Sequence, residues 1–238
     1  MKVDVFGRYM DITSDDVKGR NVVVIDVFRT TSVIVTALDN GAECIFPAES
    51  IQEAWELFNR SRDGKTLLGG ERNALPITGF HLDNSPMSYT REKVRGKKIV
   101  LTTSNGTRAI RVCIGAENLF IASFLNVSRV VDTLGHQERD VSLVCSGTHG
   151  TFSLEDGLCA GMIVSALAKK KDVTVSDLGW AMKSLYQSEP DIKNALREGS
   201  LAYRYLLQTG YTDDIEICLR CDVSATLPAY HSDCVRPL

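Results

Sequence analysis

Short apolar stretches that end in glycine, hydroxyl and charged residues most constrain how this chain can fold. Residues 21–26 read Asn-Val-Val-Val-Ile-Asp, a β-branched run typical of a strand that is buried on both faces. Segments with a helical spacing of apolar residues follow several such runs. Because strands and helices alternate, the sequence predicts an α/β fold, a three-layer α/β/α sandwich with a mostly parallel sheet. The other predicted strands are residues 44–47, 66–68, 98–101, 119–122 and 141–145.

The predicted helices have recognisable ends. Residues 31–38 carry apolar side chains at helical spacing and stop at Asn40-Gly41, a pattern typical of a helix C-cap. Ser50, with Glu53 three residues further on, forms a capping-box pattern that predicts the start of another helix. Further helices are predicted near residues 108–110, 127–134 and 154–169.

The last third of the chain differs from the rest. From Val175 onward it is more helical and more polar. We predict a single domain over residues 1–238, with a candidate subdomain from about residue 171 to 238. Residues 213–219 are expected to add a late strand.

Composition and charge narrow the functional class. With 238 residues and a net charge of −3, the chain lacks the basic character expected of a nucleic-acid binder. No apolar run approaches the roughly 20 residues of a membrane span, and the N-terminus lacks the apolar region of a signal peptide. The seven cysteines lie in apolar stretches, as expected for buried thiols in a reducing compartment. We therefore predict a cytoplasmic protein without a nucleic-acid or membrane partner.

Polar loops follow four of the predicted strands, at the position where open α/β sheets bind ligands. In the first loop, Asp26 can ligate a metal, while Arg29, Thr30 and Thr31 suit a phosphate at a helix N-terminus. A helix cap with a surface ion pair explains these residues about equally well.

The second and third loops are rich in glycine and hydroxyl groups. Gly69-Gly70 permits a close backbone approach to a ligand, and Glu71 and Arg72 offer a cation ligand and an anion clamp. Residues 102–107, Thr-Thr-Ser-Asn-Gly-Thr, resemble an anion nest, although they lack the Gly-Lys-Ser/Thr ending of a P-loop. Plain turns explain either loop on its own.

The fourth loop spans residues 146–157. Its Glu155 and Asp156 start a helix, where acids complement the helix dipole or supply oxygen ligands to Mg²⁺. His149 is a candidate general acid or base, although a His in a glycine-rich loop is more often a hydrogen-bonding support. Four such loops on one rim of the sheet predict one shared site.

The remaining candidates are weaker. Cys218 and Cys221 have the spacing of a redox motif, but residues three apart on a strand face opposite ways, which favours a structural role. His81, His136 and His231 have no catalytic context in the sequence.

At these same loops the sequence resembles the 2-phosphosulfolactate phosphatase family. The resemblance spans most of residues 20–165 and implies Mg²⁺-dependent hydrolysis of 2-phospho-3-sulfolactate to sulfolactate and phosphate, a step in coenzyme M biosynthesis. Asp26 is followed by Val27 and Phe28, so the Asp-x-Asp motif of haloacid-dehalogenase phosphatases is absent. A phosphoenzyme intermediate is therefore not required, although Asp26 stays a candidate nucleophile. The matching stretches are residues 24–32, 69–72, 79–86, 102–107, Glu155-Asp156 and 159–161.

Loop chemistry and resemblance together define a predicted site for a small, highly anionic phosphate ester. The predicted Mg²⁺ ligands are Asp26, Glu71, Glu155 and Asp156. The predicted catalytic residues are Asp26, Glu155 and His149. The predicted substrate-binding residues are Arg29, Thr30, Thr31, Arg72, Ser104, Asn105, Gly106 and Thr107.

Three alternatives stay open at this point. The substrate can be another small phosphorylated carboxylic acid, because sulfonate and carboxylate are recognised by the same donors. The chain can be a non-catalytic anion-binding module, although acids around an anion pocket argue against this. A thiol redox protein that uses Cys218 and Cys221 is a third reading. We also expect a homo-oligomer, for which two-fold symmetry is the commonest form.

Overall fold

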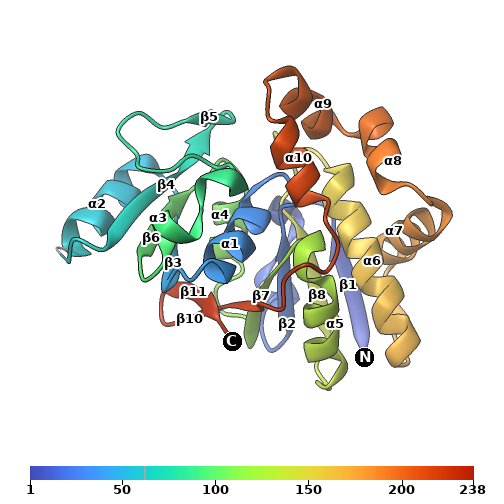
Figure 1. The fold of residues 1–238 in the computed structure, drawn as a ribbon. Helices are drawn as coiled ribbons and strands as arrows, with labels where there is room; N and C mark the ends of the chain where they lie inside the picture. Colours follow the sequence, from blue (N-terminus) through green and yellow to red (C-terminus); the bar gives the residue numbers. More distant parts are fainter. Residues whose placement is uncertain (62) are drawn as a thin grey trace.

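A computed structural model describes residues 1–61 and 63–238. One mixed, mostly parallel sheet of 11 strands is flanked by helices (Figure 1), which confirms the predicted α/β class. The strand order is β5-β4-β6-β3-β11-β10-β7-β2-β8-β1-β9. The strands are β1 (Lys2–Phe6), β2 (Asn21–Ile25), β3 (Cys44–Ala48), β4 (Thr66–Arg72), β5 (Leu75–Pro76), β6 (Lys98–Thr102), β7 (Asn118–Ala122), β8 (Val141–Cys145), β9 (Thr174–Val175), β10 (Pro228–His231) and β11 (Cys234–Pro237).

The helices begin and end close to the predicted positions. Helix α1 stops at Asp39, and Gly41 follows with a φ of 89°. Ser50 Oγ accepts a hydrogen bond from Glu53 N–H at 3.0 Å, while the Glu53 carboxylate accepts one from Glu49 N–H. The helices are α1 (Thr30–Asp39), α2 (Ile51–Ser61), α3 (Arg91–Val94), α4 (Gly106–Val112), α5 (Val127–Gly135), α6 (Leu154–Lys170), α7 (Asp177–Ser188), α8 (Ile192–Gly199), α9 (Leu201–Gln208) and α10 (Thr212–Cys218).

Two parallel runs of strands make up the sheet, and the C-terminal hairpin links them. Strands β9, β1, β8, β2 and β7 are parallel neighbours, as are β3, β6 and β4. The hairpin of β10 and β11 is antiparallel to both runs. It meets each run through one residue pair, Ala229 with Phe120 and Val235 with Ile45. The link between the two halves of the sheet is therefore narrow.

The alternation of side chains along β2 builds a core on each face of the sheet. Val23 and Ile25 pack in the core that holds α5 and α6, whereas Val22 and Val24 pack in the core that holds α1 and α4. The second core also contains Ile45 of β3, so α1 and α4 share a core with both halves of the sheet. This shared core holds the two halves at a fixed orientation.

The predicted strand over residues 213–219 is wrong, because this segment forms α10. Ile215 and Cys218, three residues apart, both lie buried in the core shared with β1 and β8. The stretch Ile-Glu-Ile-Cys alternates like a strand, but burial of residues three apart needs a helix. The strand predicted over residues 66–68 is also longer than expected, and β4 carries Glu71 and Arg72.

The C-terminal third is helical from α7 to α10, as predicted, and then returns to the sheet. Leu196, Tyr203 and Leu206 of α8 and α9 lie in the same core as α6. Helices α8, α9 and α10 gather at the top of Figure 1, and both termini lie at the bottom. The division into domain and subdomain stays a prediction.

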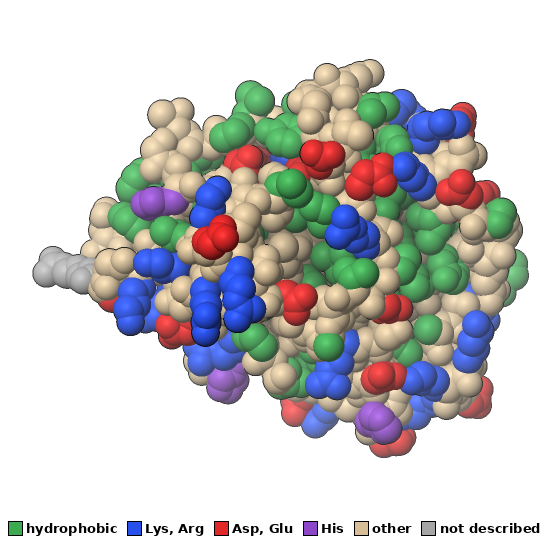
Figure 2. All heavy atoms as spheres, in the orientation of Figure 1, with side chains coloured by type: hydrophobic (Ala, Val, Ile, Leu, Met, Phe, Trp, Pro, Cys, Tyr) green, Lys and Arg blue, Asp and Glu red, His purple; other side chains and the backbone are tan. Residues whose placement is uncertain are grey.

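Acidic, basic and apolar side chains are interspersed over the face drawn in Figure 2. Among the described helices, none has the length and apolar character needed to cross a membrane.

The hairpin link can be tested by its contribution to stability. Val235 is buried opposite Ile45, so Val235→Ala removes packed methyl groups where the two halves meet. We expect the free energy of unfolding to fall by about 1–3 kcal/mol in urea denaturation. The control Val223→Ala changes a side chain that is 59% exposed, and should alter it by less than about 0.5 kcal/mol. Equal, small effects of both variants would contradict the proposed role of the hairpin.

Candidate active site

The polar loops predicted to share one rim line one cavity of about 1010 Å³. The loops after β2, β4, β6 and β8 contribute to its wall, and α9 contributes a large further part. The prediction that these loops meet is therefore confirmed. The predicted residues that line the cavity are Asp26, Arg29, Thr30, Glu71, Ser104, Asn105, His149 and Glu155.

Asp26 lies at the carboxyl end of β2, where the chain turns into α1. Its backbone carbonyl accepts a hydrogen bond from Thr31 N–H at 2.9 Å, and its carboxylate accepts one from Thr30 N–H at 3.3 Å. Burial raises the pKa of the Asp26 carboxyl to about 6. A Cβ on Gly106 would stand 2.4 Å from Asp26 Oδ2, so glycine is required at the start of α4 for the two loops to meet.

Glu155 and Asp156 are adjacent at the start of α6 but have different surroundings. The Glu155 carboxylate lines the cavity and accepts a hydrogen bond from Ser200 Oγ at 2.7 Å. The Asp156 carboxylate accepts hydrogen bonds from Val27 N–H at 2.8 Å, Gly147 N–H and Ser146 Oγ. Burial raises the pKa of both carboxyls, and the charge of Asp26 adds to the effect. Asp156 thus joins the loops after β2 and β8.

The loop after β6, predicted to bind an anionic group of the substrate, instead donates hydrogen bonds to a carboxylate of the protein, that of Glu71. The Glu71 carboxylate accepts hydrogen bonds from Ser104 N–H at 2.6 Å, Ser104 Oγ at 3.1 Å and Ala74 N–H at 2.7 Å. These donors fix the Glu71 side chain at the cavity wall. Asn105, the next residue, lines the cavity beside them.

Arg29 is fixed by a buried network that the sequence did not predict. Its Nη1 lies 2.6 Å from Asp214 Oδ2 of α10, and its guanidinium stands 4.2 Å from the centre of the Tyr211 ring. Ser85 Oγ donates a hydrogen bond to the other oxygen of Asp214. The network thereby joins the β2–α1 turn, the loop before α3 and α10.

The sequence profile of the family described as 2-phosphosulpholactate phosphatase matches residues 8–233. A relative in Clostridium novyi (strain NT), named a probable 2-phosphosulfolactate phosphatase, is 37% identical over 97% of both chains. Proteins of the same name in Clostridium perfringens (strain SM101 / Type A) and Caldicellulosiruptor saccharolyticus are each 41% identical, over 92% and 93% of this chain and 89% and 93% of their own length. The chain belongs to the 2-phosphosulfolactate phosphatase family.

In this member of the 2-phosphosulfolactate phosphatase family, a family of phosphoric monoester hydrolases, the other predicted residues support the cavity wall. Thr31 Oγ1 donates to the Asp26 carbonyl, and Thr107 exchanges hydrogen bonds with Thr103. The Arg72 guanidinium donates to Thr102 Oγ1 at 2.7 Å and to the Glu71 carbonyl. The residues that lie behind the wall are Thr31, Arg72, Gly106, Thr107 and Asp156.

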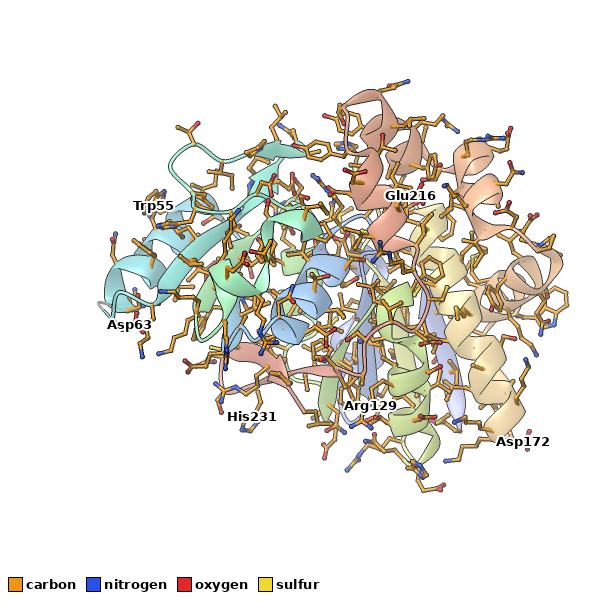
Figure 3. The ribbon with its side chains drawn as sticks, in the orientation of Figure 1. Trp55, Asp63, Arg129, Asp172, Glu216 and His231 are labelled. Carbon is orange, nitrogen blue, oxygen red and sulfur yellow. The ribbon has the colours of Figure 1, made fainter. Side chains whose placement is uncertain are left out.

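The histidines are spread over the molecule. His149 lines the cavity on an exposed turn with a φ of 50°, and its catalytic role stays a prediction. His81 Nδ1 accepts a hydrogen bond from Leu68 N–H on β4, which is a structural contact. His231 lies at the lower end of the molecule in Figure 3, far from Glu216 of α10.

Three polar residues of this region are not predicted by the sequence patterns. Asp214 was read as part of a strand, so its side chain had no assigned face. Arg204 lies on α9, beyond the segment that carries the family motifs. Asn84 lies inside one of those motifs, residues 79–86, and this was the only signal for it in the sequence.

Asn84 has a buried side chain at the cavity with an unsatisfied hydrogen-bond acceptor. Its side chain lines the cavity and is 4% exposed, and within the described chain its Oδ1 has no hydrogen-bond partner. A buried polar group without a partner lowers stability, so its presence at the cavity indicates a contact made with a bound molecule.

This interpretation predicts that Asn84→Ala leaves the ligand-free protein as stable as the parent, or more stable, because it removes an unsatisfied group. The matched variant Asn126→Ala should lower the free energy of unfolding by about 2 kcal/mol or more. The Asn126 amide donates to the Ile121 and Thr226 carbonyls and accepts from Ser123 N–H. Urea denaturation measures both variants, and a similar loss for the two would make Asn84 a structural residue.

Proposed function

We propose that this chain hydrolyses 2-phospho-3-sulfolactate to 3-sulfolactate and phosphate, and that it uses Mg²⁺. One observation carries the proposal: the buried carboxylates of Asp26, Glu71 and Glu155 line the same cavity as the guanidinium of Arg29. Carboxylates alone would repel an anionic substrate. Together with a bound cation they form a site for a phosphoryl group. Family membership supports the choice of substrate.

The donor set fits Mg²⁺. Among the residues described, no three acidic, His or Cys side chains converge to hold a metal by themselves. Mg²⁺ does not require such a cage, because it binds one or two carboxylates and completes its shell with substrate phosphate and water. We propose Asp26 and Glu155 as these ligands. Glu71 also lines the cavity, but Glu71 and Asp156 each accept three hydrogen bonds from the protein. When bound, Mg²⁺ would neutralise charge on the phosphoryl group.

The remaining residues would bind and orient the substrate. Arg29 and the hydroxyl of Thr30 line the cavity next to Asp26, so they would hold the oxygens of the phosphoryl group. Asn105 would donate from the turn after β6. We propose that Asp26 also orients the water that attacks phosphorus, with cleavage of the bond between phosphorus and the C2 oxygen, which ends as the hydroxyl of sulfolactate.

The proposal also includes the pathway and the cellular location of the reaction. A role in coenzyme M biosynthesis and a cytoplasmic location are supported by the family and by the cysteines. All seven are free thiols, and six are buried. Cys218 is fully buried, and burial raises the pKa of its thiol to about 12, which argues against the thiol redox alternative.

Phosphate release from a panel of esters tests the proposal. We expect fast release from 2-phospho-3-sulfolactate with Mg²⁺ and none with excess EDTA, and slow release from 2-phospholactate and 3-phosphoglycerate. Faster turnover of another ester would keep the mechanism and replace the substrate. Absence of release from all of them, with binding of inorganic phosphate in calorimetry, would favour the anion-binding module.

Replacement of the central carboxylate tests the assigned chemistry. Asp26→Asn keeps the size of the side chain but removes its charge, so we expect kcat to fall by at least about 100-fold. Asp15→Asn, a change of the same kind at an exposed position, should retain the parent rate. Circular dichroism would confirm that both variants are folded, and a near-parental rate for Asp26→Asn would overturn the assignment.

A further inference from the structure

Helix α9 lies outside the family motifs of the sequence, but it also lines the cavity and carries an arginine there. Arg204 lines the cavity and is half-buried. The proposed function uses Arg29 at the reacting end of the site and assigns no role to Arg204. A substrate with three acidic groups needs more than one cationic contact.

The two arginines differ in the charge that surrounds them. Arg29 is 3% exposed and its charge is balanced by Asp214. In the part of the chain that the structure describes, Arg204 has no ion-pair partner, and its Nη1 donates to the Glu198 carbonyl at 2.7 Å. A neutral carbonyl positions the guanidinium without cancelling its charge. Arg204 therefore places a guanidinium at the cavity wall that no acidic side chain of the described residues pairs with.

Contacts on both sides of Arg204 fix its position. Ser200, the N-cap of α9, donates from Oγ to the Glu155 carboxylate at 2.7 Å and accepts from Tyr203 N–H. Tyr205 donates from its hydroxyl to the Asn73 carbonyl at 3.4 Å, in the loop after β4. Arg204 thus lies on a segment tied to both a proposed metal ligand and the opposite half of the sheet. A guanidinium held in a fixed position favours ligands that place an anionic group within its reach.

We propose that Arg204 is a specificity-determining residue, which binds the sulfonate on C3 of the substrate. This inference rests on the proposed function. The phosphate and the carboxylate are carried on C2 and C1, so the sulfonate lies at the other end of the three-carbon skeleton. Arg29 and Asp26 come from the same loop and would hold the phosphate on C2. Arg204 is then the cation left for a terminal acidic group, and the proposal assigns it to the sulfonate on C3, the group that 2-phospholactate lacks.

The consequence is a preference among phosphate esters. A charge-assisted hydrogen bond between guanidinium and sulfonate accounts for about a 10- to 100-fold difference in kcat/KM. 2-Phospholactate has the same phosphate and carboxylate but no sulfonate. It lacks the group that Arg204 binds, so its turnover depends less on this residue.

The test compares the two esters with Arg204→Gln and Arg204→Lys. For Arg204→Gln we expect kcat/KM on 2-phospho-3-sulfolactate to fall about 10- to 100-fold, and on 2-phospholactate by less than about threefold. Arg204→Lys should restore part of the loss, because it keeps the charge but not the two-pronged geometry. Arg197→Gln, an exposed arginine on the preceding helix, should leave both values at the parental level.

Calorimetry provides a second measurement that is independent of turnover. Arg204→Gln should weaken the binding of 3-sulfolactate about 10- to 100-fold and that of inorganic phosphate by less than about threefold. Equal losses for both esters, or unchanged binding of 3-sulfolactate, would overturn the role of Arg204 while leaving the phosphatase proposal intact. Failure of the parent protein to release phosphate from 2-phospho-3-sulfolactate would instead overturn the proposed function.

Discussion

The burial of several carboxylates in one place is the constraint on which the rest of this structure depends. Asp26, Glu155 and Asp156 are all at most 6% exposed, and burial raises the pKa of each carboxyl. Such a cluster costs stability unless hydrogen-bond donors and cations surround it. The backbone N–H groups of the loops after β2 and β8 supply donors to Asp156. The cost of this cluster indicates that the buried acidic groups serve the function of the protein.

The architecture brings those donors and cations to the carboxylates from distant parts of the chain. Helices α1 and α4 share one core with both halves of the sheet, so the loops after β2 and β6 are held together. Gly106 permits the closest approach, beside Asp26. Helix α10 contributes Asp214, which balances Arg29, and Ser85 joins the same network from the loop before α3. The cavity therefore depends on contacts between three regions that lie far apart in the sequence.

The acidic residues and the arginines of the site have different roles because their surroundings differ. Glu71 and Asp156 each accept three hydrogen bonds from the protein and fix the loops, whereas the carboxylates of Asp26 and Glu155 accept fewer. Among the arginines, Arg29 is neutralised by an ion pair, whereas Arg204 has none with the residues that the structure describes. Similar residue types thus take structural or ligand-directed roles according to their neighbours. Sequence motifs alone do not separate these roles.

The sequence by itself determined the α/β class, most helices and strands, and the meeting of four polar loops, because periodicity and turn chemistry act over a few residues. It identified Asp26, Glu71 and Glu155 at strand and helix ends. Only the tertiary structure decided that residues 213–219 form a helix, since burial of Ile215 and Cys218 outweighs their local alternation. It also decided that Arg72 and Thr107 lie behind the wall, and that Asn84 and Arg204 line the cavity. Contacts between distant segments set these positions, and no local pattern encodes them.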